Sequence, residues 1–293
     1  MSEYTPDTAE TLETIAQFVS ETPPGELSQV LNDIRGLVNN DSLVSEAIAQ
    51  PLSVHNTNTL ALVAVAGSDA SFIVSKFNAL EGNRFVDPNA KLSYAVDHLA
   101  QTASDPVPHE SNNETEEHRA ALNAAINTYT QDHYPNGHCA VFSHDNSRTL
   151  NIGIVSNKFN PNNFWNGRWI SQWTANLDSD EISGELFIHV HYYEDGNVQV
   201  KTTKHATAKL ASIPSDPTAF ASAVVAQMLK IETEYQLALN ASYAQISDST
   251  FKSLRRALPI TRTKLDWNSV SNCEDIVFFF YSLADIIMLK PPL

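Results

Sequence analysis

The stretch LFIHVHYYEDGNVQVKTTK, residues 186–204, decides the fold class of this chain. Two segments with alternating apolar residues, Leu186–Tyr192 and Asn197–Lys204, flank the dipeptide Asp195-Gly196. The backbones of Asp and Gly tolerate the positive φ angles that a tight hairpin turn requires. The stretch therefore predicts two antiparallel strands joined by a short turn.

The same pattern extends towards the N-terminus. Two apolar runs, Cys139–His144 and Thr149–Asn157, predict strands with a turn at Asp145-Asn146, and Asn166-Gly167 is a second turn dipeptide. Successive strands with short turns favour an antiparallel meander over residues 138–210.

Shorter apolar runs precede this region. Leu60–Val65 and Ser71–Phe77 predict two strands separated by a Gly-Ser-Asp turn. The polar stretch Gln101–His118 indicates a surface connection, and a short helix is expected from Glu116 to about Tyr129.

Helical periods dominate both ends of the chain. In the first 50 residues, apolar positions recur at helical spacing around a Pro-Pro-Gly break, which predicts a small bundle of helices over Leu12–Val19, Leu27–Val38 and Leu43–Ile48, the last ending before Pro51. Near the C-terminus, Asp216 is a plausible N-cap and Pro217 a first helical residue. An apolar stripe from Phe220 to Ile246 predicts one long amphipathic helix lying across a sheet or a partner helix, followed by a new cap at 247–249 and a shorter helix to Pro259. The fold class is α+β.

Charge and targeting signals restrict the location of the chain. The 293 residues carry 34 acidic and 18 basic side chains, a net charge of −16, which disfavours nucleic acid as a partner. Met1–Glu13 lacks the basic and apolar regions of a signal peptide. The apolar run Ile276–Leu289 contains Asp285 and is too short to cross a bilayer as a helix. These features predict a cytoplasmic protein.

The sequence nominates no catalytic residue, metal ligand set or cofactor site. The chain has no phosphate-binding loop, nucleophile elbow or HExxH pair, so no catalytic residue and no cofactor is nominated. His189-x-His191 places two imidazoles on one strand face, but zinc needs three or four ligands, and a polar sheet face is favoured. Cys139 and Cys273 are expected to be reduced thiols.

Two local patterns remain. A turn followed by a strand places Trp169, Ser171 and Trp173 on one face, which indicates core or a subunit contact. Phe251–Lys264 (FKSLRRALPITRTK) has five basic side chains and no acid. A solvated face and a patch for acidic protein surfaces or anionic lipid headgroups explain it equally well. Its basic residues are Lys252, Arg255, Arg256, Arg262 and Lys264.

Five collinear segments resemble the α subunit of F-actin capping protein. Most specific are FWNGRW and LPITRTKLDW. The first is the family signature Phe164, Trp165, Asn166, Gly167, Arg168 and Trp169. The five segments are Phe18–Asp41, Arg84–Leu99, Asn160–Trp173, His191–Val200 and Leu254–Trp267.

The resemblance implies a fold and a function. The family is a non-enzymatic, obligate heterodimer with a capping protein β subunit, related by a pseudo-twofold axis, with a sheet that continues across the dimer. It binds barbed ends of actin filaments without calcium, blocks subunit gain and loss, and does not sever. The five basic residues above would contact actin and take part in phosphoinositide regulation. The implied division is a helical stalk (1–55), a β-rich centre (56–210) and a long helix with the basic segment (216–264).

The resemblance ends after Asn268, so residues 1–268 form the family region. The tail 269–293 has no family counterpart. We hypothesise that it arises from an unspliced intron, an alternative exon or a gene-prediction error, which transcript sequencing across codon 270 tests. An alternative function is a membrane-associated adaptor that uses the basic patch and the apolar tail.

Overall fold

The computed structural model describes residues 8–109, 114–143, 148–194 and 197–245. The chain divides into two compact units, Met1–Val225 and Ala226–Leu293. In its described part, the first unit holds four α-helices, two sheets and the start of the last helix. Among its described residues, the second unit consists of the continuation of that helix to Gln245.

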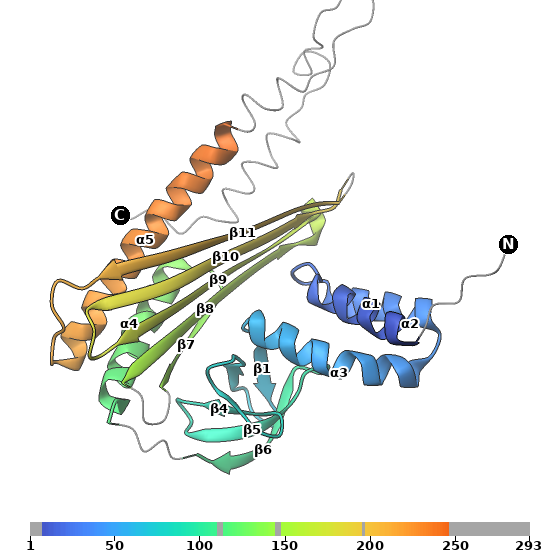
Figure 1. Cartoon of the computed structure of the whole chain (residues 1–293), viewed down its shortest axis with the longest axis horizontal. Coiled ribbons are helices and arrows are strands. Elements are labelled where there is room, and N and C mark those ends of the chain that lie inside the picture. Colours follow the sequence, from blue (N-terminus) through green and yellow to red (C-terminus); the bar gives the residue numbers. More distant parts are fainter. Residues whose placement is uncertain (1–7, 110–113, 144–147, 195–196, 246–293) are drawn as a thin grey trace, which may run out of the picture. The chain divides into compact units, whose positions relative to one another are not determined.

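Three helices form the N-terminal bundle: α1 (Thr8–Ser20), α2 (Leu27–Val38) and α3 (Asp41–Asn58) (Figure 1). Asn40 caps α3, since its Oδ1 accepts a hydrogen bond of 3.2 Å from Leu43 N. The bundle core consists of buried apolar residues of these helices alone, so the predicted bundle is confirmed. They are Ile15, Val19, Leu31, Ile34, Val44, Ile48 and Leu52.

The predicted end of the third helix is wrong, because α3 continues through Pro51 to Asn58. An interior proline costs roughly 3 kcal/mol. The residues beyond it are anchored by tertiary contacts that outweigh this cost. Leu52 is buried in the bundle core, and Asn56 donates from Nδ2 to the backbone oxygen of His98 at 2.8 Å.

The first sheet has six strands in the order β2-β1-β6-β5-β4-β3. Only β1 and β6 pair in parallel among these strands, and the other pairs are antiparallel. Its core includes Val63, Phe85, Tyr94, Val96 and Ala103. The strands are β1 (Leu62–Val65), β2 (Ser71–Ile73), β3 (Ala79–Leu80), β4 (Arg84–Asp87), β5 (Leu92–Asp97) and β6 (Thr102–Pro108).

Strand β6 corrects the sequence prediction that 101–118 is a surface connection. It lies between β1 and β5, where backbone pairing on both sides compensates for its polar composition. Ala103 is fully buried. The outward Asp105 accepts a hydrogen bond from Arg84 Nη1 at 2.8 Å, which holds the polar side of the strand in place.

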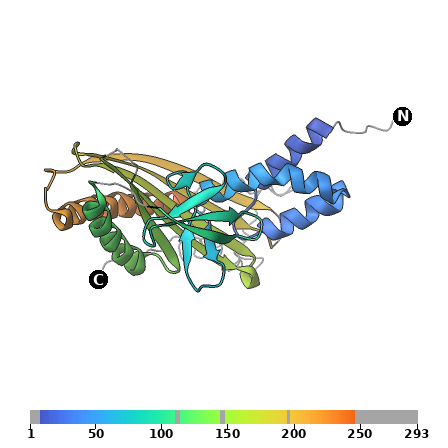
Figure 2. The ribbon, with the colours of Figure 1, turned by 90° about the horizontal axis from the view of Figure 1, so that it is seen from below.

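The second sheet is the predicted antiparallel meander. Its five strands follow the order β11-β10-β9-β8-β7. The helix α4 (Glu116–His133) extends to His133 and lies against this sheet (Figure 2). The rings of Tyr134 and Trp169 lie 6.0 Å apart at this contact. The strands are β7 (Gly137–Ser143), β8 (Thr149–Asn160), β9 (Trp165–Asn176), β10 (Glu181–Tyr192) and β11 (Val198–Lys209).

The prediction of a turn at Asn166-Gly167 is wrong. Both residues lie within β9, where Asn166 pairs with His191 and Gly167 with Val190. The chain reverses earlier, through a 3₁₀ turn at Pro161–Asn163, and Phe164 takes the left-handed conformation (φ 57°) that closes it. The proposed turns at Asp145-Asn146 and Asp195-Gly196 lie outside the described residues.

The last helix, α5 (Pro217–Gln245), begins where the sequence predicts. Asp216 Oδ2 accepts a hydrogen bond from Ala219 N at 2.8 Å, and Pro217 is the first helical residue. Within the first unit, the ring of Phe220 lies edge-on to His118 at 5.8 Å. Ile246, the cap at 247–249 and the helix to Pro259 lie outside the described residues. No helix in the described part of the chain is both long and apolar enough for a membrane crossing.

Candidate functional site

Three segments of the family resemblance meet at one carboxylate. Oε1 of Glu26 lies 2.6 Å from Nδ1 of His191 and accepts a hydrogen bond of 3.1 Å from Nδ2 of Asn166. Asn166 and His191 face each other directly across β9 and β10. Because a carboxylate only accepts hydrogen bonds, Nδ1 of His191 carries the proton. Glu26, Asn166 and His191 are called the junction below, since they join the link between α1 and α2 to the sheet.

The Pro-Pro-Gly turn sets the position of Glu26. Glu26 N donates to Pro23 O at 3.2 Å, and Gly25 has a φ of +80°. A Cβ added to Gly25 would lie 3.0 Å from the ring of Phe159 in β8. Gly25 therefore serves both the left-handed backbone and the close approach of the link to the sheet.

The two histidines of the His189-x-His191 pair are buried and hydrogen bonded. His191 Nε2 lies 3.1 Å from Asn197 Oδ1, and His189 Nε2 lies 3.0 Å from Gln199 Oε1. Within the described ranges, no group of three or more His, Cys, Asp or Glu side chains could hold a metal ion. These contacts give both imidazoles a structural role on the sheet face.

A cationic row crosses the sheet next to the junction. Arg168, His189 and Lys201 face one another in register on β9, β10 and β11. Burial lowers the pKa of Arg168 to about 10, and its Nε donates to Asn157 Oδ1 at 2.8 Å. Burial, together with Lys201 and Arg168, lowers the pKa of His189 to about 4. His189 is therefore neutral at pH 7.

His55 of α3 completes this environment. Burial lowers its pKa to about 4, and the charge on Arg168 acts in the same direction. Two cavities, of about 460 and 310 Å³, adjoin this region, and both are lined by His55, Thr59 and Arg168. The sheet face thus has space beside a charged guanidinium.

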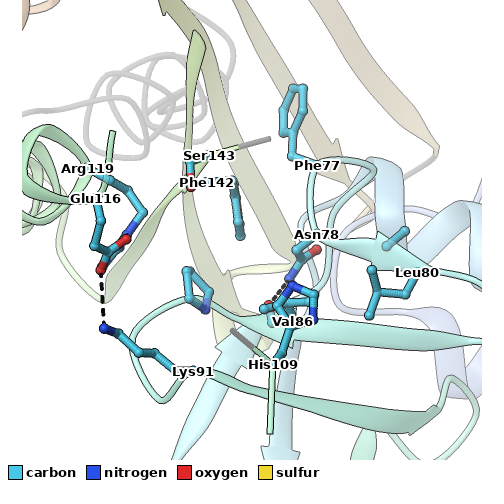
Figure 3. Close-up of a pocket in the computed structure, with 12 residues that line it drawn as sticks. Phe77, Asn78, Leu80, Val86, Lys91, His109, Glu116, Arg119, Phe142 and Ser143 are labelled. Carbon is cyan, nitrogen blue, oxygen red and sulfur yellow. Dashed lines mark hydrogen bonds and ion pairs between the residues drawn. The ribbon is translucent and has the colours of Figure 1, made fainter. Parts of the chain in front are cut away.

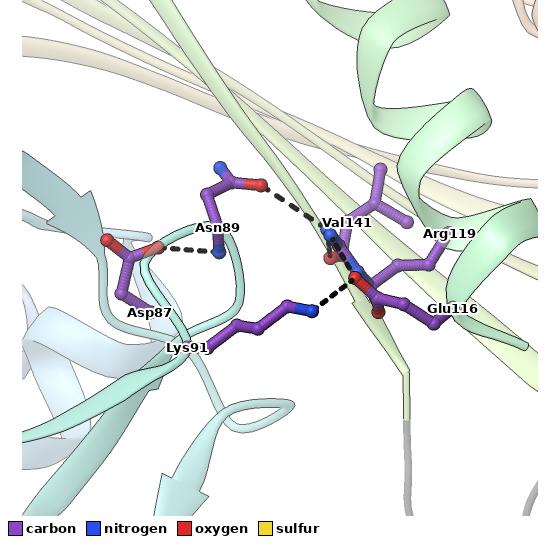
Figure 4. Close-up of polar contacts among 6 residues, drawn as sticks. All are labelled: Asp87, Asn89, Lys91, Glu116, Arg119 and Val141. Carbon is purple, nitrogen blue, oxygen red and sulfur yellow. Dashed lines mark hydrogen bonds and ion pairs between the residues drawn. The ribbon is translucent and has the colours of Figure 1, made fainter. Parts of the chain in front are cut away.

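A separate polar cluster ties α4 to both sheets (Figure 4). Arg119 Nε bonds Glu116 Oε2 at 2.7 Å, and its Nη1 donates to Asn89 Oδ1 at 3.3 Å and to Val141 O at 3.4 Å. The hydrogen bond from Arg119 holds the pKa of Glu116 below its usual value. The adjacent cavity, lined by Phe77, Asn78 and His109 among others, is only about 100 Å³ (Figure 3). This cluster is a structural tie.

The predicted site residues fall into two groups. Of the signature residues, Phe164 is exposed and closes the turn before β9, and the other five begin β9. Trp165 and Trp169 are buried on one face of the strand, and Asn166 and Arg168 lie on the other. The predicted actin-binding residues are outside the described part of the chain. They are Lys252, Arg255, Arg256, Arg262 and Lys264.

Sequence reasoning did not single out Glu26 or His55. A signal for Glu26 was present in the sequence. Glu26 directly follows the Pro-Pro-Gly turn, His191 lies in an apolar strand, and both belong to segments of the family resemblance. Nothing in the local pattern around His55 indicates burial. Pro51 predicts that the helix ends before it, which would place His55 outside the helix.

A sequence profile described as "F-actin capping protein alpha subunit" matches residues 15–274. The chain belongs to this family. The capping-protein α relatives include one from Caenorhabditis elegans, 36% identical over 89% of this chain and 94% of that protein, and one from Emericella nidulans, 35% identical with the same coverage. Both are named F-actin-capping protein subunit alpha. The match extends six residues past Asn268, into the first residues of the tail 269–293.

The capping-protein α fold is also found in a solved structure. A homodimeric actin capping protein alpha subunit from Plasmodium berghei superimposes with a TM-score of 0.72, covering 86% of this chain and 98% of that one. At 24% identity, this likeness supports the α+β fold with two sheets and nothing further. The sequence resemblance to the family is confirmed.

Proposed function

We propose that this chain is the α subunit of a heterodimeric F-actin capping protein and binds the barbed ends of actin filaments. The observation that carries the proposal is the match to the family over residues 15–274, together with relatives of nearly equal length that are named as capping subunits. By the same reasoning the chain is a non-enzymatic part of the actin cytoskeleton that works without calcium and does not sever filaments.

The open edge of the second sheet supports assembly with a β subunit. Strand β11 pairs with β10 through twelve successive residues, without a bulge. On its other side it has no strand partner among the described residues. Val198, the first residue of β11, is 47% exposed. A long, regular edge of this kind is a template for another chain. We infer that a β subunit continues the sheet at β11.

The actin-binding residues are proposed from the sequence. Lys252, Arg255, Arg256, Arg262 and Lys264 form a basic cluster in a chain of net charge −16. Such a cluster speeds the encounter with an acidic surface and fixes its orientation. Phosphoinositides would compete for the same charges, which provides a route for regulation.

The proposed division of the chain follows the family. Residues 1–55 form the stalk, 56–210 the β-rich centre and 216–264 the long helix with the basic segment, while 269–293 form the atypical tail. The alternative of a membrane-associated adaptor is not favoured, because the relatives are named as capping subunits.

Seeded actin elongation tests the proposal. The chain is co-expressed and co-purified with a capping protein β subunit, and elongation is followed at barbed ends. Arrest at nanomolar complex is the expected result. A complex that forms but leaves elongation unchanged contradicts capping by this chain, and the same assay on a complex lacking 269–293 then shows whether the tail is responsible.

Self-association of the lone chain is the competing assembly, because the Plasmodium berghei neighbour is described as homodimeric. Analytical ultracentrifugation of the chain with and without the β subunit separates the two cases. A stable homodimer that does not exchange into a heterodimer would contradict the proposed partner.

A further inference from the structure

The cationic row of the second sheet faces a cavity. Arg168, His189 and Lys201 occupy directly opposed positions on three adjacent strands, and all three line a cavity of about 310 Å³. Neighbouring strands are about 4.8 Å apart, so the row brings its polar ends into one small region. A volume near 300 Å³ lies at the lower end of the range of small-molecule sites, roughly 300–1,000 Å³.

The ends of two helices and the loop after β2 also line the cavity. Ser20, the last residue of α1, and Asn58, the last residue of α3, both line it, together with Thr22. Lys76, on the loop after β2, lines it as well, and its Nζ lies 5.0 Å from the centre of the Phe77 ring. The lining thus combines three permanent cations with hydroxyl and amide groups.

The charges around the cavity are not balanced by carboxylates. Arg168 has no ion pair within the described ranges, and its Nε donates a hydrogen bond to Asn157. Glu185 is the one carboxylate among the described lining residues, and it lies 3.8 Å from His205 Nδ1 on the outer strand. Although the chain has 34 carboxylate side chains, none of those described forms an ion pair with this partly buried guanidinium.

The state of the histidines fits the same picture. His55 and His189 both line the cavity, and both have a pKa lowered to about 4 by burial and by the cations near them. They are neutral at pH 7 and add no further positive charge. A pKa lowered in part by neighbouring cations indicates a positive potential in this region, which an anion would relieve.

We infer that this cavity binds a small anion carrying phosphate groups. A guanidinium offers paired N–H donors that match phosphate oxygens, and ammonium groups bind phosphate as point charges. Lys76 and Lys201 stand on different elements and would hold the anion against Arg168. The ligand is either a free phosphate compound or the phosphorylated headgroup of a lipid, which share this chemistry.

The test measures pyrophosphate binding by isothermal titration calorimetry on the full chain in its purified assembly. Lys201→Gln and Lys76→Gln each remove one cation from the lining at an exposed position. Each should weaken binding about tenfold, the scale of one charge-assisted hydrogen bond. Lys204→Gln is the matched control, because it removes the same charge from the same strand on the opposite sheet face.

The source of the phosphate group is distinguished in a second arm. Vesicles with and without a phosphoinositide are tested for co-sedimentation with the same variants. In this arm every variant also carries alanine at Arg256, Arg262 and Lys264, so that the basic segment does not bind the lipid. Loss in Lys201→Gln but not in Lys204→Gln, for either pyrophosphate or vesicles, supports the site and identifies its ligand source. No binding in either arm, or equal weakening by Lys201→Gln and Lys204→Gln, overturns the inference. Neither outcome depends on whether the assembly caps actin.

Discussion

Nδ1 of His191 lies 2.6 Å from Oε1 of Glu26, although the two residues are 165 positions apart in the sequence. The same oxygen accepts from Asn166, which pairs with His191 across two strands. One carboxylate oxygen therefore fixes the link between α1 and α2 on two neighbouring strands.

Removing this carboxylate should destabilise the chain. Glu26→Ala leaves the donors of Asn166 and His191 without their acceptor in a largely buried site, which costs about 1–3 kcal/mol. Chemical denaturation of the purified assembly measures the free energy of unfolding. Glu46→Ala is the control, because Glu46 is an exposed residue of α3. Equal stability of the two variants would contradict the structural role of the junction.

The pairing of Gly184 with Trp173 predicts a steric effect. The two residues face each other across β10 and β9, and a Cβ on Gly184 would overlap the indole of Trp173, which is 1% exposed. Gly184→Ala should therefore cost about 1–3 kcal/mol by overpacking.

Gly36→Ala provides the opposite case. Gly36 lies inside α2 with open space around the position of a Cβ, so alanine should stabilise the chain by roughly 0.5–1 kcal/mol. Thermal unfolding of both variants gives the comparison. Melting temperatures that shift in the same direction would show that the indole moves aside or that α2 does not gain from alanine.

The buried histidines predict a dependence of stability on pH. His55 and His189 have pKa values lowered from 6.5 to about 4, so the unfolded chain binds more protons than the folded chain between these values. The part of the unfolding free energy that depends on these histidines is fully present above pH 6.5. It is lost as the pH decreases towards 4, by on the order of 3 kcal/mol for each histidine.

Unfolding free energies at pH 7 and pH 4.5 test this dependence. The double variant His55→Gln, His189→Gln should lose less stability between the two pH values than the parent chain. His205→Gln, an exposed position on β11, should behave like the parent. An unchanged loss in the double variant would assign the acid sensitivity to carboxylates instead.

The basic segment predicts a loss of capping. Replacing Arg256, Arg262 and Lys264 together by alanine removes three proposed charge contacts with actin. A charge contact at a protein surface is worth roughly 0.2–1 kcal/mol. The affinity of the heterodimer for barbed ends should fall clearly but not completely, with no change in circular dichroism. Capping by the triple variant at the parent's affinity would remove these residues from the actin contact.

Local patterns predicted the elements of this fold well where periodicity was strong. The helix beginning at Asp216-Pro217 and the strands of the meander follow from caps and alternation that need no long-range information. Asn166-Gly167 was misassigned because a dipeptide suited to turns also fits a strand, and the preceding Pro161–Asn163 turn made it redundant.

Other features depend on contacts that local sequence does not contain. Strand β6 is polar, and its place between β1 and β5 is fixed by partners on both sides. The continuation of α3 beyond Pro51 is supported by the hydrogen bond from Asn56 to His98, which is distant in the sequence. In the sequence, the residues of the junction share only one property, which is that each lies in a segment of the family resemblance. Nothing near Glu26 in the sequence indicates His191 as its partner.

The separation of Glu26 from His191 also has a consequence during synthesis. A ribosome adds roughly 5–20 residues per second, so the 165 residues between them take about 8–33 s to appear. For most of that interval the residues of all three N-terminal helices have been made, but the strand that carries His191 has not. On the nascent chain, the helices can therefore be held together only by the apolar core that they share. This core consists of Ile15, Val19, Leu31, Ile34, Val44, Ile48 and Leu52.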